Sequence, residues 1–213
     1  GVCEATFVVD VDVCDGGGGG ECDDGTTAGE PCEWWECGVV ACEPGGHVCV
    51  PGVEIPDDPA EAGPFASSQT LGEDVTVEEG VFPTTVDLAI FLPDGTGPFP
   101  VVVFTHGFML GPGNYTSYGR HLASWGFIVV MPQMPGGIMP PNHRELKEYL
   151  GKILDWIDES ASDPSGPLLG KADPARIGLS GHSMGGKISL LLSTEDCRPT
   201  ASFTVDPVDA AGM

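Results

Sequence analysis

The clearest chemistry in the chain lies in residues 181–185, which read G-H-S-M-G. An apolar run at 177–179 precedes this segment and another at 188–192 follows it, so the pattern predicts a strand, a tight turn and a helix. In a G-x-S-x-G turn of this kind the serine has a strained backbone, and the flanking glycines let the strand and the helix approach closely. The segment predicts a nucleophile, Ser183, beside the positive end of a helix. An ordinary glycine-rich turn is the alternative from these five residues alone.

A serine that attacks a carbonyl carbon needs hydrogen-bond donors for the oxyanion that forms. The backbone N–H of Met184, the residue after the serine, is one candidate. The second is the N–H of Phe108, in the loop that follows the apolar run 100–105. His106, at the start of that loop, is assigned a structural role rather than that of a base. Met184 and Phe108 are therefore the predicted oxyanion donors.

The acid that orients the catalytic base is expected after the serine, at the end of a later strand. Asp206 meets both conditions because it directly follows the strand-like run 201–205. Asp209 is the alternative acid, and a plain strand-ending turn is the structural alternative for Asp206. The base should be a histidine beyond the acid, but all five histidines precede Asp206, and none of them is predicted as the base. The simplest account is that the printed chain is a fragment that ends before the catalytic histidine.

The elements that must position these groups alternate between strand and helix patterns. Continuous apolar runs at 100–105 and 127–131 are typical of strands buried on both faces of a parallel sheet. A helical period is present at 144–160, and a shorter helical segment at 115–125 is closed by Gly126. The alternation predicts an α/β domain with a mostly parallel sheet. Further strands are predicted at 74–77, 84–92, 177–179 and 201–205.

The first 52 residues have the composition of a small disulfide-rich module. Dense cysteine in a short, glycine-rich segment predicts a disulfide framework and an extracellular or cell-surface location. Because seven cysteines lie there and the eighth is Cys197, either Cys197 pairs with the module or one partner lies outside the chain. A metal site is not predicted, since there is no C-x-x-C pair. The seven are Cys3, Cys14, Cys22, Cys32, Cys37, Cys42 and Cys49.

Two adjacent tryptophans, Trp34 and Trp35, lie within this module. The favoured interpretation is that they form its small core. The alternative is that they are exposed and contact a polymer or a surface. A proline-rich acidic linker is predicted to follow the module. The predicted organisation is therefore a module at 1–52, a linker at 53–68 and a catalytic domain at 69–213.

The charge of the chain is strongly acidic. It has 32 acidic and 8 basic residues, a net charge of -24 at pH 7, and no Lys or Arg precedes Arg120. This balance disfavours nucleic acid as a partner, because phosphate contacts need clustered Lys and Arg. No apolar run approaches the ~20 residues of a membrane span. A solvated acidic surface is the favoured interpretation.

Three segments together resemble one group of enzymes. Residues 101–134, residues 173–187 (D-P-A-R-I-G-L-S-G-H-S-M-G-G-K) and residues 205–209 (V-D-P-V-D) are similar to chlorophyllases, to bacterial polyester hydrolases of the cutinase type and to platelet-activating-factor acetylhydrolases. The resemblance does not extend to the Cys-rich module. It implies an α/β-hydrolase fold without a cofactor, incomplete at its C-terminus, and a C-terminal histidine that this chain lacks. It also implies Ser183 as nucleophile, Asp206 as acid, and Phe108 and Met184 as oxyanion donors.

The predicted function is that of a secreted or surface-attached serine carboxylic-ester hydrolase that acts through an acyl-enzyme. The 213-residue chain alone is expected to be inactive because it lacks the catalytic histidine. The alternative is a non-catalytic binding or adhesion protein with a hydrolase-like domain and a contact through Trp34 and Trp35. The sequence downstream of Met213 distinguishes the two, because a histidine there supports the enzyme and a stop codon supports the binding protein.

Overall fold

The computed structural model describes residues 38–43, 46–51, 60–77, 84–136 and 142–209. The chain divides into a smaller unit within residues 7–61 and a larger unit that contains residues 62–213. In the smaller unit, β1 (Gly38–Glu43) and β2 (Gly46–Pro51) form an antiparallel hairpin. The predicted disulfides of the module and its two tryptophans lie outside the described side chains. Cys197, in the larger unit, is disulfide-bonded.

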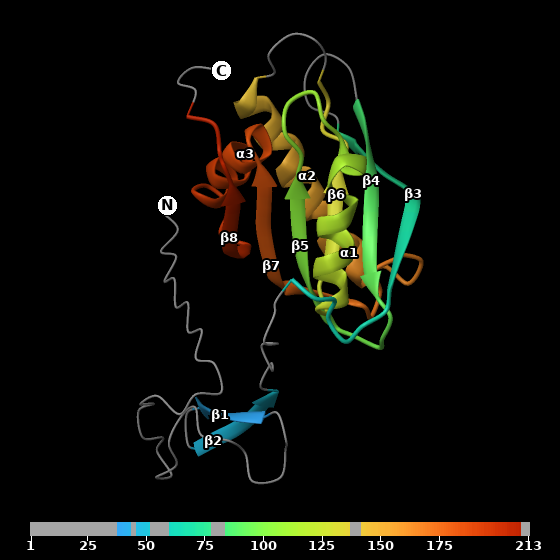
Figure 1. Cartoon of the computed structure of the whole chain (residues 1–213), viewed down its shortest axis with the longest axis vertical. Coiled ribbons are helices and arrows are strands. Elements are labelled where there is room, and N and C mark those ends of the chain that lie inside the picture. The colour runs from blue at the N-terminus through green and yellow to red at the C-terminus, as the bar shows by residue number, and fades with distance from the viewer. Residues whose placement is uncertain (1–37, 44–45, 52–59, 78–83, 137–141, 210–213) are drawn as a thin grey trace. The chain divides into compact units, whose positions relative to one another are not determined.

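The larger unit is built on a six-stranded sheet with the order β3-β4-β6-β5-β7-β8 (Figure 1). The pairs β3–β4 and β4–β6 are antiparallel, whereas β6–β5, β5–β7 and β7–β8 are parallel. The sheet is therefore mixed and mostly parallel, which confirms the predicted α/β class. Its strands are β3 (Ser67–Val77), β4 (Thr84–Pro93), β5 (Phe99–Thr105), β6 (Ile128–Pro132), β7 (Ala172–His182) and β8 (Pro199–Val205).

Helices cover both faces of this sheet. One face carries α2 (His143–Ser162) and α3 (Met184–Ser193), whose apolar side chains share one core with β4, β5, β6 and β7. The other face carries the short 3₁₀ helix η1 (Pro112–Tyr115) and α1 (Thr116–Ser124), which pack on a second, smaller core. The result is a three-layer arrangement in which each helix predicted from the sequence packs against one face of the sheet.

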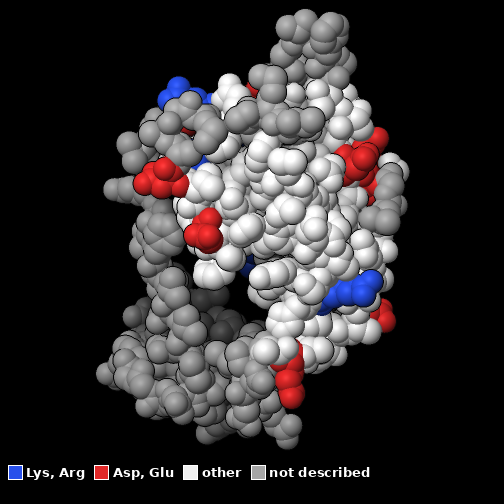
Figure 2. Space-filling model, turned by 45° about the horizontal axis from the view of Figure 1, so that its top comes forward, with Lys and Arg blue, Asp and Glu red and all other residues white. Residues whose placement is uncertain are grey.

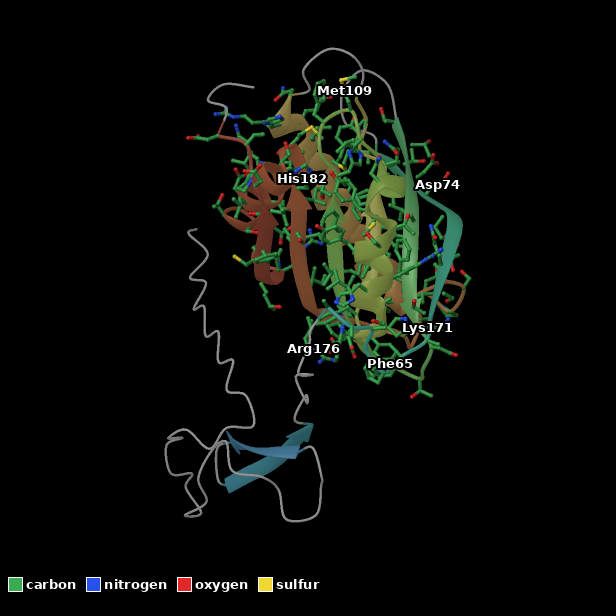
Figure 3. The ribbon with its side chains drawn as sticks, viewed as in Figure 1. Phe65, Asp74, Met109, Lys171, Arg176 and His182 are labelled. Carbon is green, nitrogen blue, oxygen red and sulfur yellow. The ribbon has the colours of Figure 1, made fainter. Side chains whose placement is uncertain are left out.

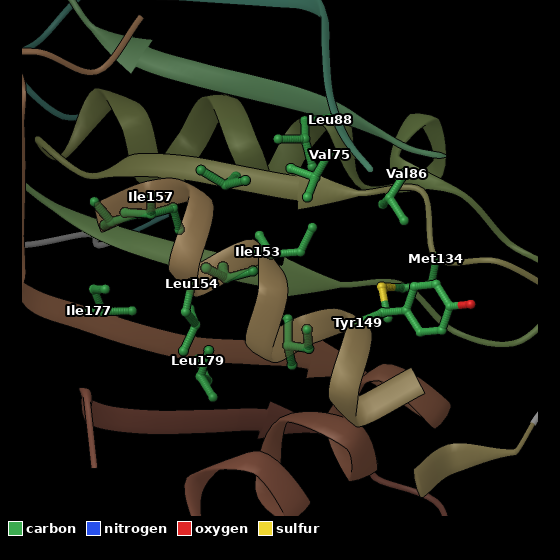
Figure 4. Packing of buried hydrophobic residues seen from close by; sticks show 14 of the residues in the cluster. Val75, Val86, Leu88, Met134, Tyr149, Ile153, Leu154, Ile157, Ile177 and Leu179 are labelled. Carbon is green, nitrogen blue, oxygen red and sulfur yellow. The ribbon is translucent and has the colours of Figure 1, made fainter. Parts of the chain in front are cut away.

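The larger core lies under α2 (Figure 4). Leu150, Ile153, Leu154 and Ile157 recur at helical spacing and are fully buried. They pack against strand residues such as Val103 that alternate along the pleated sheet. This apolar stripe is the periodic pattern that predicts the helix, and its burial holds α2 against one face of the sheet.

Two strands are longer than the apolar pattern predicts. β3 begins at Ser67 rather than at residue 74, and its first residues are polar and exposed. Because backbone pairing with β4 holds this outer strand, its first part needs no buried side chains. β7 begins at Ala172, with a register shift before Ile177 that separates its polar first part from its buried second part. Both extensions depend on pairing partners, which a hydrophobic pattern does not report.

A cluster of charges ties the loop between α3 and β8 to helix α2. The guanidinium of Arg198 lies 2.6 Å from Asp196, 2.8 Å from Asp155 and 3.1 Å from Asp158. Hydrogen bonds from Arg198 lower the pKa of Asp196, and the carboxylates raise the pKa of Arg198. Three carboxylates therefore share one planar cation that has several donors to offer.

Replacing Arg198 with methionine is expected to destabilise the larger unit by about 1–2 kcal/mol at pH 7, because three carboxylates lose their shared cation at a partly buried site. The pKa of Asp196 is lower in the folded state, so this contribution is present above the unfolded carboxyl pKa of about 4 and is lost as the pH falls through the folded value. Urea midpoints of wild type and variant should therefore converge in acid. The control is Arg176→Met, which removes an exposed pair with Asp173 and should change stability by less than about 1 kcal/mol. Equal losses in the two variants at pH 7 would contradict the role of the cluster.

Candidate functional site

Ser183 lies at the junction of β7 and α3, in a strained turn. Its backbone has φ 54° and ψ -116°, a conformation that costs a non-glycine residue about 1–3 kcal/mol. A Cβ on Gly185 would lie 2.0 Å from the carbonyl oxygen of Thr105, and one on Gly181 would lie 2.6 Å from the carbonyl carbon of Gly185. The two glycines are therefore required by the close approach of α3 to the ends of β5 and β7. The turn has the geometry that the G-x-S-x-G pattern predicts.

The segment that contains Asp206 is hydrogen-bonded to the backbone of Ser183 on both sides. The N–H of Ser183 donates to the carbonyl oxygen of Val205 at 3.0 Å, and the N–H of Val208 donates to the carbonyl oxygen of Ser183 at 3.2 Å. Asp206 lies between these two contacts, at an exposed position with φ 47°. The structure thus brings the predicted acid's segment against the predicted nucleophile, although α3 and β8 separate them in sequence.

His106 opens the loop after β5, and both of its ring nitrogens are engaged. Its Nδ1 donates to the carbonyl oxygen of Gly107 at 2.8 Å, and its Nε2 accepts from the N–H of Met134 at 3.0 Å. Burial lowers its pKa, so the ring is neutral and can accept at Nε2. His106 therefore connects the loop after β5 to the loop after β6, the structural role that the sequence predicts for it.

Backbone strain is concentrated at one edge of the sheet. Within the described part of the chain, the non-glycine residues with positive φ are Met109, Ser183 and Asp206, with φ of 59°, 54° and 47°. They follow β5, β7 and β8, three neighbouring parallel strands whose carboxyl ends share one edge. Figure 3 shows Met109 and His182 at this end of the sheet, away from Phe65 and Arg176 at the other. Strain of this kind clusters at functional sites, where the surrounding structure maintains it.

The two predicted oxyanion donors lie at the same edge. Met184 is the first residue of α3, so its N–H has no acceptor within the helix. Phe108 lies in the loop after β5, next to Gly107, whose carbonyl oxygen accepts from Leu110 at 3.1 Å. Each donor is adjacent to one of the strained positions, because Met184 follows Ser183 and Phe108 precedes Met109.

A pocket of about 330 Å³ is lined in part by His182, the residue before the serine, and by Val205, whose carbonyl oxygen accepts from the N–H of Ser183. Its wall is largely aromatic, since the ring of Phe104 lies 5.0 Å from that of Tyr115 and 5.5 Å from that of Tyr118. In Figure 2, where this edge is tilted forward, the described residues carry few charges. The pocket suits an uncharged, largely apolar group. It is lined by Phe104, Leu110, Asn114, Tyr115, Tyr118, His182 and Val205.

The sequence pattern did not identify this pocket. Tyr115 and Tyr118 were predicted only as part of a helical segment, and His182 only as a neighbour of the nucleophile. The hydroxyl of Tyr115 lies 2.8 Å from Nδ1 of His182, a contact between residues far apart in the chain. The two tyrosines within residues 115–118, in the segment after the loop that follows β5, are the one sequence signal that could have indicated it.

Two further histidines, His121 and His143, lie on helices. His121, on α1, has its ring 6.5 Å from that of Trp125. His143 is the first residue of α2, and burial, with a smaller contribution from the charge of Lys187, lowers its pKa. In the part of the chain that the structure describes, no group of three or more His, Cys, Asp or Glu residues could hold a metal ion. Among those same residues, no helix is long and apolar enough to cross a membrane.

Comparison with known proteins places this site in a family. Residues 61–213 match the family model Chlorophyllase. Chlorophyllase-1, chloroplastic, of Citrus sinensis is 32% identical over 111 residues, which cover 52% of this chain and 33% of that protein. Chlorophyllase-1 of Arabidopsis thaliana is 28% identical over 166 residues, 75% of this chain and 45% of that protein.

A bacterial relative is named for a different substrate. Bis(hydroxyethyl) terephthalate hydrolase of Streptomyces coelicolor is 29% identical over 152 residues, which cover 66% of this chain and 46% of that protein. The chain thus spans about a third to a half of the length of these curated relatives. The family match includes the strained serine, the segment hydrogen-bonded to it and the loop after β5. The chain therefore belongs to the chlorophyllase family of α/β-hydrolases.

Proposed function

We propose that the complete protein is a serine hydrolase of carboxylic esters. The observation that carries this proposal is the strained Ser183, hydrogen-bonded on both sides to the segment that contains Asp206. The family match supports ester hydrolysis as the reaction. The secreted or surface-attached location predicted from the cysteines is part of the proposal and rests on the sequence.

In the proposed mechanism, the Ser183 hydroxyl attacks the ester carbonyl carbon and loses its proton to a histidine base. The N–H groups of Met184 and Phe108 stabilise the negative oxygen, and removal of one such donor costs about 10²–10³ in rate in comparable enzymes. The alcohol leaves with that proton, and water then releases the acyl group from the serine. The carboxylate of Asp206 orients the histidine.

The substrate we propose is an ester with a bulky, uncharged group next to the scissile bond. The aromatic wall of the pocket that His182 and Val205 help to line supports this class, because apolar surface is buried favourably against Phe104 and Tyr118. The names of the relatives, a chlorophyllase and a bis(hydroxyethyl) terephthalate hydrolase, are compatible with this class of ester.

Covalent labelling tests the nucleophile directly. A fluorophosphonate probe incubated with the complete gene product is expected to modify Ser183, because an activated serine attacks phosphorus as it attacks a carbonyl carbon. Trypsin cleaves after Arg176 and Lys187, so the adduct should lie on the peptide 177–187. That peptide also contains the buried Ser180, which serves as an internal control and should stay unmodified in the fragment spectrum. A folded protein that takes no label would favour the binding-protein alternative, and label on Ser180 would contradict the assignment.

A further inference from the structure

The hydroxyl of Tyr115 lies between the two segments that carry the proposed oxyanion donors. It accepts a hydrogen bond from the N–H of Gly107 at 3.2 Å, and it lies 2.8 Å from Nδ1 of His182. An N–H only donates, so the phenol oxygen is the acceptor toward Gly107 and its proton is available to His182. The hydroxyl therefore bridges the loop after β5 and the turn after β7.

The three groups are in close contact. A Cβ on Gly107 would lie 3.0 Å from Nδ1 of His182 and 3.3 Å from the hydroxyl oxygen of Tyr115. Tyr115 is 7% exposed and belongs to the second core, where the ring of Phe104 lies 5.0 Å from its own ring. Because the ring is held by packing, its hydroxyl occupies a fixed point between Gly107 and His182.

Each residue that the hydroxyl contacts precedes a residue of the proposed catalytic machinery. Gly107 precedes Phe108, and His182 precedes Ser183, which is followed by Met184. We propose that Tyr115 is a positioning residue that sets the separation of the Phe108 and Met184 N–H groups. The inference rests on the proposed ester hydrolysis. Oxyanion donors act only when they lie within about 2.7–3.1 Å of the developing charge, so a small change in their separation weakens both contacts.

Tyr115→Phe in the complete gene product removes the bridge and keeps the ring. We expect kcat for a p-nitrophenyl ester to fall about 10–100-fold, with KM changed less than about threefold. The reason is that the displaced donors would bind the negative oxygen of the transition state less well, whereas they contribute little to binding the uncharged ester. The control is Tyr149→Phe, which removes the hydroxyl of an equally buried tyrosine in α2, 3.4 Å from Thr84, and should leave kcat unchanged. Equal kcat in the Tyr115 variant and wild type would overturn the inference. Absence of turnover in wild type would instead count against the proposed function.

A second readout separates positioning from a general structural loss. In a thionoester the reacting oxygen is replaced by sulfur, a larger and weaker acceptor that gains less from the oxyanion donors. Tyr115→Phe should therefore reduce the preference for the oxoester over the matched thionoester. Equal losses for both esters would show a structural role only and would overturn the inference.

His182→Phe breaks the same bridge from the other side. If the bridge acts as a unit, this variant should show a similar loss of oxoester preference, and the double variant with Tyr115→Phe should lose little more than either single variant. Additive losses would contradict a shared role. Because either single variant breaks the bridge, the loss of oxoester preference in His182→Phe keeps the test decisive if Tyr115→Phe proves unstable.

Discussion

Replacing Ser183 with alanine in the complete gene product is expected to abolish ester hydrolysis, with a loss of kcat of about 10⁴-fold or more. The variant removes the Oγ that would form the acyl-enzyme and leaves the oxyanion donors in place. The serine side chain makes no capping hydrogen bond at the start of α3, so the fold loses little. The measurement is p-nitrophenyl ester turnover, with the thermal midpoint of each variant recorded beside it.

Two further variants sharpen this expectation. Ser162→Ala, at the exposed end of α2, is the matched control and should keep full activity. Ser183→Gly should be equally inactive yet more stable than wild type, by about 1 kcal/mol, because glycine adopts φ 54° without the strain of a side chain. A stabilised, inactive glycine variant would show that backbone strain at residue 183 is maintained for function. Turnover by Ser183→Ala at the wild-type rate would contradict the proposed mechanism.

The sequence predicts the parts of this fold whose signals are local. The buried strands β5 and β6 and the helix α2 follow from apolar runs and from a helical period, and each is observed at nearly the predicted position. The polar first part of β3 has no such signal, because it is held by hydrogen bonds to β4 rather than by burial. The bulged start of β7 likewise depends on its partner β5. Pairing across the sheet is thus the information that periodicity lacks.

The same distinction applies to the site. The elbow at Ser183 is predictable because its turn, its glycines and its helix are contiguous in sequence. The hydrogen bond between Tyr115 and His182 joins two segments that only the parallel pairing of β5 and β7 brings together. The aromatic pocket that Tyr115 and His182 line is for the same reason a product of the fold. Local sequence therefore predicts the reaction type, whereas the contacts that would position the proposed donors are formed only in the folded chain.

Replacing Gly185 with alanine is expected to destabilise the larger unit by about 3 kcal/mol or more, because overpacking against fixed backbone has no inexpensive relief. The new Cβ would lie 2.0 Å from the carbonyl oxygen of Thr105, 2.4 Å from its carbonyl carbon and 2.7 Å from the carbonyl oxygen of His106. These are backbone atoms at the end of a central strand, so α3 must move away from β5. Urea denaturation followed by circular dichroism measures the loss.

The control for this variant is Gly113→Ala in η1, where a Cβ would meet nothing within 4 Å and stability should change by less than about 1 kcal/mol. A Gly185 variant as stable as this control would contradict the close approach of α3 to β5. If the Gly185 variant remains folded at low temperature, its activity should still be lost. The displaced helix carries Met184, and the strand end against which it clashes leads into the loop of Phe108, so the clash separates the two proposed oxyanion donors. Loss of activity in a folded Gly185 variant would then show that the glycines of the elbow set the donor geometry as well as the packing.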